Sequence, residues 1–150
     1  MIQQRLDMQQ VTPNAGKAIM ALEEYLGTTN LKPLHKEIIK LRASIINKCA
    51  YCIDMHTKDL RKLGETEQRL YLLSAWKETT VFSEEEQAIL AITDEITELP
   101  QQGVTNETYT NALTLFGAEY LSHIIMAIIT INAWNRLAVA TNMGLLVIAE

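Results

Sequence analysis

Two cysteines and one histidine form the densest group of reactive side chains in the sequence. Cys49 and Cys52 are three residues apart, and His56 follows Cys52 by four residues. If the chain is helical from about Ala50 onward, Cys52 and His56 share one face of that helix, because residues four apart are neighbours on a helix surface. Cys49 then sits at the helix start, where free backbone N–H groups and the helix dipole favour a thiolate.

This arrangement is typical of dithiol redox chemistry. A neighbouring imidazole can take the thiol proton, and both the imidazole and the helix terminus lower a cysteine pKa, which raises the thiolate fraction near neutral pH. Two cysteines in a C-x-x-C sequence can close a short disulfide, so that one attacks an oxidant and the other resolves the product. The spacing therefore favours a reactive cysteine pair assisted by His56.

Two other interpretations fit the same residues. Cysteines at helical spacing are often inert and buried, because a free cysteine packs as a small hydrophobe. C-x-x-C with a histidine is also half of a zinc site, although a structural zinc site normally has four protein ligands. Only His35, Glu37 and His123 could complete such a set, and the sequence has no second C-x-x-C. Spacing alone leaves the redox, metal and inert interpretations open.

Composition limits the class of protein. The chain has 150 residues, of which 48% are hydrophobic and 21% charged, as expected for one soluble globular domain. A net charge of −5 without a basic stripe argues against nucleic acid as a partner. The N-terminus lacks the apolar run of a signal peptide, and the longest uncharged run, residues 120–135, is short and polar for a membrane span. We therefore expect a cytoplasmic protein without a membrane partner, a reducing setting in which C-x-x-C is more often catalytic or metal-binding than a structural staple.

The elements that must position these residues are helices. Apolar stripes and capping residues predict helices over about 13–27, 33–46, 50–64, 65–77, 84–99, 105–117 and 118–140. The last of these is apolar on nearly every face, which is typical of a helix buried in a core or a subunit interface. No convincing strand pattern precedes the tail, so we predict an all-α bundle. The bundle forms one domain over 1–150, with an arm at 1–11, a core at about 15–140 and a tail at 141–150.

Several polar residues outside the cysteine helix need a separate interpretation. Glu37 lies at the margin of an apolar helix face, and its spacing favours pairing with a nearby lysine in solvent over an inward position. His123 lies in the last helix, where a buried structural histidine is a commoner outcome than a pocket residue. His35 is expected at the surface, and Asp59 on the solvated side of the cysteine helix.

A resemblance to the alkylhydroperoxidase AhpD-like family, within the carboxymuconolactone decarboxylase superfamily, rests on Glu37, Cys49, Cys52 and His56. The interval from Glu to Cys and the intervening Leu-Arg-Ala at 41–43 also resemble that family. Residues 131–137 are similar to the closing helix of many members. The resemblance covers about residues 15–140 and implies an AhpD-like helical bundle. It also implies a peroxiredoxin-type thiol peroxidase or disulfide oxidoreductase, an antioxidant enzyme acting on hydroperoxides.

The resemblance implies a role for each residue of the site. Cys52 is the sulfur expected to attack peroxide and become a sulfenic acid, and Cys49 then resolves it into a disulfide. His56 and Glu37 form a proton relay that activates Cys52 and protonates the leaving hydroxyl. An external dithiol such as lipoamide, a protein thiol or a reductase protein restores the reduced pair, so no bound metal or cofactor is expected.

The sequence departs from the best-known members of that family between the two cysteines, where Tyr51 replaces a second histidine. A tyrosine can donate a hydrogen bond but is a poor base near neutral pH. Tyr51 and His123 are the candidate pocket residues. The resemblance further implies a homo-oligomer, a trimer or a hexamer. The alternatives are a non-enzymatic metal-binding or redox-sensing helical module and a carboxymuconolactone decarboxylase-like enzyme, although members without cysteines perform the latter reaction and this chain keeps both.

Overall fold

The computed structural model describes residues 3–145, and within that range every regular element is a helix. In chain order the elements are α1 (Met8–Val11), α2 (Pro13–Gly27), α3 (Pro33–Ile46), α4 (Ala50–Lys62), α5 (Glu67–Leu72), the 3₁₀-helix η1 (Leu73–Glu78), α6 (Glu84–Glu98) and α7 (Asn106–Thr141). The predicted all-α fold is confirmed. The final part of the predicted tail, from residue 146, lies outside the described residues.

Capping residues explain where several helices begin. At the start of α6 the Glu86 N–H donates to Ser83 Oγ at 3.2 Å, and the Ser83 N–H donates to Glu86 Oε2 at 2.7 Å, which completes a capping box. Cys49 is the N-cap of α4, and its sulfur accepts a hydrogen bond from the Cys52 N–H at 3.3 Å. Thr12 precedes α2 as predicted, but its side chain makes no capping hydrogen bond, so the following proline alone marks that start.

Backbone conformation locates two breaks in the helices predicted from residue 65 onward. Gly117 interrupts α7 with φ 74° and ψ 165°, a left-handed conformation that favours glycine. This break falls where the sequence predicted one helix to end and the next to begin. The helix predicted over 65–77 is divided into α5 and the 3₁₀-helix η1 at Leu72–Leu73, and η1 itself is kinked at Ala75, which has φ −122° and ψ 33°.

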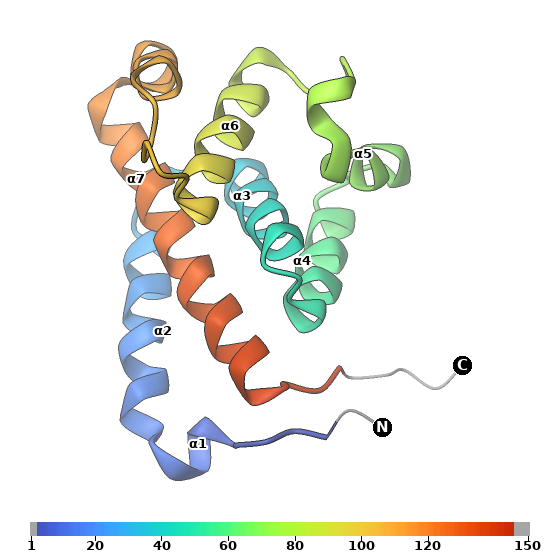
Figure 1. Ribbon diagram of the computed structural model, residues 1–150, viewed down its shortest axis with the longest axis vertical. Coiled ribbons are helices and arrows are strands. Elements are labelled where there is room, and N and C mark those ends of the chain that lie inside the picture. Colours follow the sequence, from blue (N-terminus) through green and yellow to red (C-terminus); the bar gives the residue numbers. More distant parts are fainter. Residues whose placement is uncertain (1–2, 146–150) are drawn as a thin grey trace.

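Helix α3 lies inside the bundle, where it contacts α4, α6 and α7 (Figure 1). Helix α7 is apolar and long enough to span a membrane by length and composition, but one of its faces packs on α2, α3 and α6. The expected burial is seen for one face of this helix; Ile129 and Val139 on the rest are 44% and 46% exposed in the single chain, and the subunit interface that would cover them remains a prediction. Its inward face is fully buried and consists of Leu121, Ile124, Ala127, Ile128 and Ile131.

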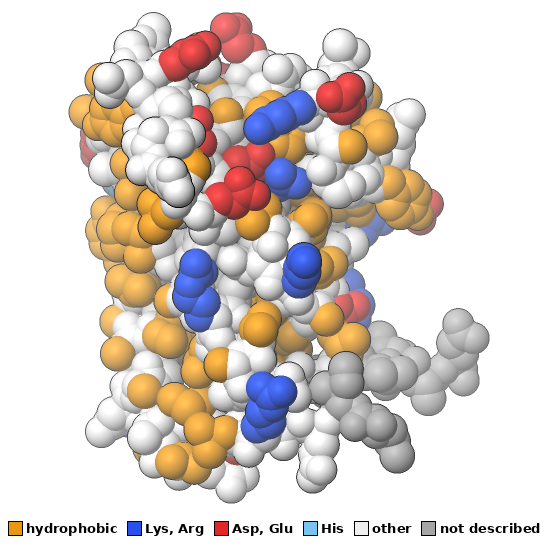
Figure 2. Space-filling model, viewed as in Figure 1, with side chains coloured by type: hydrophobic (Ala, Val, Ile, Leu, Met, Phe, Trp, Pro, Cys, Tyr) orange, Lys and Arg blue, Asp and Glu red, His pale blue; other side chains and the backbone are white. Residues whose placement is uncertain are grey.

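Apolar side chains remain at the surface of the two helices that form one edge of the bundle. Figure 2 shows hydrophobic side chains gathered along the edge where Figure 1 places α2 and α7. Met20 and Tyr25 of α2 are 46% and 42% exposed, close to the value for Ile129 of α7. A homo-oligomer would bury such a surface, and the oligomer remains a prediction.

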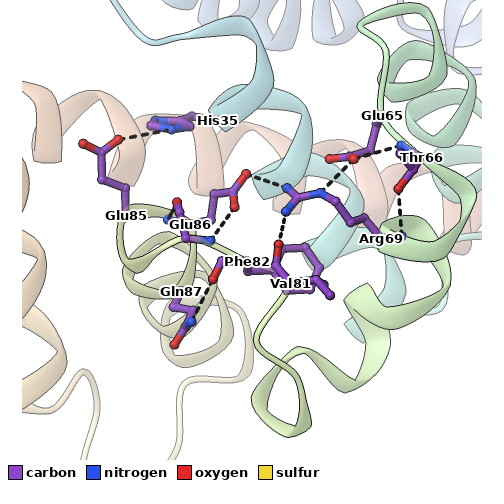
Figure 3. Close-up of polar contacts among 10 residues, drawn as sticks. His35, Glu65, Thr66, Arg69, Val81, Phe82, Glu85, Glu86 and Gln87 are labelled. Carbon is purple, nitrogen blue, oxygen red and sulfur yellow. Dashed lines mark hydrogen bonds and ion pairs between the residues drawn. The ribbon is translucent and has the colours of Figure 1, made fainter.

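A charged network connects α5 with α6 through their side chains (Figure 3). Arg69 donates to Glu65 at 2.8 Å, to Glu86 at 2.6 Å and to the carbonyl oxygen of Val81. Burial by itself lowers the pKa of Arg69, but the hydrogen bonds and charges of the two carboxylates outweigh burial and raise that pKa above its usual value. The guanidinium also lies 4.7 Å from the centre of the Phe82 ring. This network is structural, since each charge in it has a partner.

Candidate functional site

The two cysteines form a disulfide at the start of α4, with their Cα atoms 5.3 Å apart. Both side chains are buried, at 1% exposure for Cys49 and 2% for Cys52. The capping position of Cys49 has a chemical consequence. When the disulfide is reduced, the Cys52 N–H and the positive end of the helix dipole stabilise negative charge on the Cys49 sulfur.

His56 and Glu37 form a buried hydrogen-bonded pair close to this disulfide. His56 Nδ1 lies 2.8 Å from Glu37 Oε2, and the two residues are only 3% and 9% exposed. Glu37 comes from α3 and His56 from α4, so the packing of these two helices brings the pair together. The interpretation that Glu37 pairs with a lysine in solvent is wrong, because that packing turns the carboxylate inward.

The second ring nitrogen of His56 is buried and unpartnered. Among the residues that the structure describes, Nε2 has no hydrogen-bond partner. Buried polar atoms nearly always have a partner, so an exception of this kind needs an explanation. Because Glu37 engages Nδ1 and fixes the ring, Nε2 is the nitrogen left to serve a bound molecule or a reduced cysteine.

A cavity of about 540 Å³ adjoins these residues. Cys52, His56 and Glu37 line it, and so does Tyr51, as predicted for a pocket residue, whereas Cys49 does not. The disulfide is therefore approached from the Cys52 side. The rest of the wall is largely apolar and includes Met20, Met55, Ile131, Trp134, Ala138 and Met143.

Three charged residues of the cavity wall were missed by the sequence analysis. Lys40 is 6% exposed and lies 2.8 Å from Glu23, and both side chains line the cavity. Asp59 also lines it, although the sequence placed this residue on the solvated side. A signal existed for Asp59, which lies seven residues after Cys52 and three after His56 and so returns to the same helix face. No comparable signal identified Glu23, because it comes from a different helix.

His123 lies outside this cavity. It is not among the lining residues, and its Nδ1 lies 3.0 Å from Asn30 Oδ1. The suggestion that His123 is a pocket residue is therefore not supported by its position, and the structural alternative describes it better.

The prediction that His35 lies at the surface is wrong, because this residue is only 4% exposed. Its Nδ1 lies 2.9 Å from the Tyr120 hydroxyl, and its Nε2 lies 3.7 Å from a carboxylate oxygen of Glu85 (Figure 3). Burial, with a smaller effect from the nearby charge of Lys32, lowers the pKa of His35 below its usual value. His35 is thus a neutral, structural histidine near neutral pH.

Comparison with known proteins connects this geometry to a family. Residues 13–95 match the model of the Carboxymuconolactone decarboxylase family, a range that contains Glu37, both cysteines and His56. The chain belongs to this family. It is also 39% identical over 137 residues to the uncharacterized protein YdfG of Bacillus subtilis (strain 168), across 91% of this chain and 93% of YdfG.

Two solved structures have a fold similar to that of this chain. A protein of unknown function from Agrobacterium tumefaciens, for which a role as the antioxidant defence protein AhpD has been suggested, superposes with a TM-score of 0.94. It is 38% identical, and the match covers 97% of this chain and 100% of the other. An uncharacterized peroxidase-related protein from Silicibacter sp. TM1040 shares the fold at 23% identity and a TM-score of 0.78, over 89% of this chain and 71% of the other. The predicted AhpD-like bundle is confirmed.

Proposed function

We propose that this protein is a thiol-dependent peroxidase and disulfide oxidoreductase that reduces hydroperoxides through Cys52 and Cys49. The observation that carries the proposal is the Cys49–Cys52 disulfide in one buried site with a His56–Glu37 pair, in which His56 Nε2 has no partner within residues 3–145. Membership of the carboxymuconolactone decarboxylase family supports it, as does the structural likeness to the Agrobacterium protein.

In the oxidative step the Cys52 thiolate attacks the outer oxygen of the hydroperoxide. The O–O bond breaks, the inner oxygen leaves as an alcohol after gaining a proton, and Cys52 becomes a sulfenic acid. His56 takes the thiol proton and returns it to the leaving oxygen, while Glu37 holds the ring and stabilises the imidazolium. The position of Cys52 in the cavity wall supports its assignment as the attacking sulfur.

In the resolving step Cys49 gives up its thiol proton and attacks the Cys52 sulfur; the S–S bond forms, the S–O bond breaks, and the hydroxyl takes up that proton and leaves as water. Two electrons have then passed from the two thiols to the peroxide. An external dithiol returns them by attacking the Cys52 sulfur from the cavity, and Cys49 leaves as a thiolate stabilised at the helix start. Closure of a second S–S bond within that dithiol releases it and restores both protein thiols.

The apolar lining of the cavity supports a substrate or reductant with a hydrocarbon part. Its wall contains six apolar residues, including Trp134 and three methionines, which suit the hydrocarbon part of an organic hydroperoxide or of a lipoamide-like dithiol. A protein thiol or reductase protein is the other source of electrons. We place the enzyme in the cytoplasm and expect a trimer or hexamer that buries the exposed apolar edge of α2 and α7.

Peroxide consumption with a panel of electron donors tests this proposal. Wild-type protein should consume cumene hydroperoxide catalytically with dihydrolipoamide or another dithiol. Cys52→Ser should abolish turnover, and Cys49→Ser should consume at most one equivalent of peroxide. Asp54→Ser, on an exposed face of the same helix, is the matched control and should behave as wild type. Equal turnover by Cys52→Ser and wild type, or no turnover by wild type with any donor, would refute the proposal.

A further inference from the structure

We propose that the reduced protein binds one Zn²⁺ ion per chain through Cys52, His56 and Asp59, with Glu37 holding the imidazole in place. The inference concerns the reduced thiol and its neighbours and does not depend on peroxide turnover. A zinc site would give a role to Asp59, which the peroxidase chemistry leaves unused, and a partner to His56 Nε2, which has none in the described part of the chain.

The three ligands follow from the pitch of α4. Cys52, His56 and Asp59 are spaced by four and three residues, which places them on one face over two helical turns. All three line the same cavity. One ligand atom each from Glu37, His56 and Asp59 lie within 4.8 Å of one another. Zinc–ligand bonds of roughly 2.0–2.3 Å place ligand atoms about 3–4 Å apart, so His56 and Asp59 already lie close to that separation, and we place the reduced Cys52 thiol, on the same cavity wall, as the third ligand.

The unpartnered nitrogen of His56 is independent evidence for a ligand. The side chain is 4% exposed, and Nε2 has no hydrogen-bond partner among the described residues. Glu37 already engages Nδ1 at 2.8 Å. A carboxylate bonded to one imidazole nitrogen, with the other nitrogen free, is the arrangement that supports a metal-ligating histidine, because it fixes the tautomer and strengthens the ligand.

The charge of the cavity favours a cation. Among the described residues that line the cavity, Lys40 is the one lysine or arginine, and its Nζ donates to both carboxylate oxygens of Glu23, at 2.9 Å and 2.8 Å. Among the described residues of the wall, Glu37 and Asp59 then remain as carboxylates that no lysine or arginine of that wall contacts. Asp59 does contact Lys62 at 2.8 Å, but these side chains are 38% and 75% exposed, and such a surface pair exchanges easily for a stronger partner.

The set of donors identifies the metal class and makes binding depend on the redox state. One thiolate, one imidazole and one carboxylate suit Zn²⁺, with water in the fourth position. Binding converts the Cys52 thiol to a zinc-bound thiolate and releases its proton. Oxidation of Cys49 and Cys52 to the disulfide by a two-electron oxidant, such as a hydroperoxide, consumes that thiolate, so oxidation removes one ligand and releases the ion. Bound zinc conversely shields the Cys52 sulfur from electrophiles.

Metal titration of reduced and disulfide forms tests the inference. Chelator-stripped protein is reduced with a phosphine, desalted and titrated with Zn²⁺ by calorimetry and with Co²⁺ by absorbance. We expect one ion per chain, a thiolate-to-cobalt charge-transfer band, and binding at least about 10-fold weaker after disulfide formation. Cys52→Ser should lose the band. Asp59→Asn should bind at least about 10-fold more weakly.

Asp54→Asn is the matched control, because Asp54 is an exposed aspartate of the same helix that pairs with Lys58 at 2.8 Å. It should bind as wild type does. Absence of binding by the reduced protein would overturn the inference, and so would equal affinity in Asp59→Asn and wild type or equal affinity in the two redox forms. Peroxide turnover is measured separately in the presence of chelator, so its failure and the failure of zinc binding are distinguishable. Circular dichroism verifies that each variant is folded.

Discussion

Two buried histidines, His35 on α3 and His56 on α4, show what separates a packing residue from a candidate catalytic one. Both are at most 4% exposed, and both are held through Nδ1, His35 by the Tyr120 hydroxyl and His56 by the Glu37 carboxylate. They differ at Nε2. The His35 nitrogen faces Glu85 at 3.7 Å, whereas the His56 nitrogen has no partner among the described residues, in a side chain that lines the cavity beside Cys52. Burial and residue type therefore do not distinguish the packing histidine from the candidate catalytic one. The distinguishing feature is the unsatisfied nitrogen of His56 beside the reactive sulfur.

The charged groups around the two histidines repeat this contrast. The neighbourhood of His35 includes the Arg69–Glu86 network, in which the guanidinium contacts two carboxylates and a backbone carbonyl (Figure 3). A fully satisfied network of this kind holds α5 to α6 through their side chains. The neighbourhood of His56 instead leaves polar atoms available to a ligand. The first region should thus control stability and the second should control turnover.

The largest effect is expected for His56→Gln. Loss of the general acid–base should lower peroxide turnover by about 100-fold, because such groups contribute roughly 10²–10⁴-fold. The Cys52 pKa should also rise, which alkylation rates of the reduced protein measured against pH would show. His35→Gln removes a histidine of equal burial and should leave turnover near wild type. An unchanged pH profile in His56→Gln, or an equal loss of turnover in both variants, would contradict the relay.

The next largest effect is a lower free energy of unfolding with unchanged peroxide turnover. Glu86→Gln removes a charge-assisted partner of Arg69 and should lower the free energy of unfolding by about 2 kcal/mol. Urea denaturation measures that change, and turnover by the folded fraction should match wild type. Leu63→Ala, at a 48% exposed position, controls for substitution in general. A turnover defect in folded Glu86→Gln would mean that the two regions are coupled.

A smaller effect on turnover is expected for Glu37→Gln. The amide can still hold the ring but cannot stabilise an imidazolium, so turnover should fall by roughly 10-fold, as for other partners that orient a histidine. The decrease should be smaller than in His56→Gln and absent in the double variant relative to His56→Gln alone. Additive losses in the double variant would show that Glu37 acts independently of His56.

The smallest effect is a pH dependence of stability. Because the pKa of His35 is lowered in the fold from 6.5, the unfolded chain binds more protons on this residue as the pH falls below 6.5. The stability that neutral His35 contributes is therefore complete above pH 6.5 and decreases as the pH falls toward the lower folded value. The melting temperature of His35→Gln should depend less on pH between 7 and 5 than that of wild type, and parallel curves would count against this assignment.

The helices and the reactive cysteine pair were predictable from the sequence, because both depend on local spacing. Helical periodicity, the capping residues around Ser83 and the break at Gly117 each act over a few residues. The position of Glu37 was not predictable from spacing alone, since it depends on how α3 packs against α4. The same reason applies to Lys40 and Glu23, which meet only in the folded chain, and to the burial of His35.

The identity of the reacting sulfur is the central claim, and one measurement tests it most directly. Cys49→Ser and Cys52→Ser proteins are each reduced, treated with one equivalent of hydroperoxide and a sulfenic-acid trap, and digested for peptide mass spectrometry. Rapid labelling of Cys52 in the Cys49→Ser protein, with little labelling of Cys49 in the Cys52→Ser protein, is the predicted result. Labelling of Cys49 as fast as that of Cys52, or no labelling of Cys52, would contradict the account.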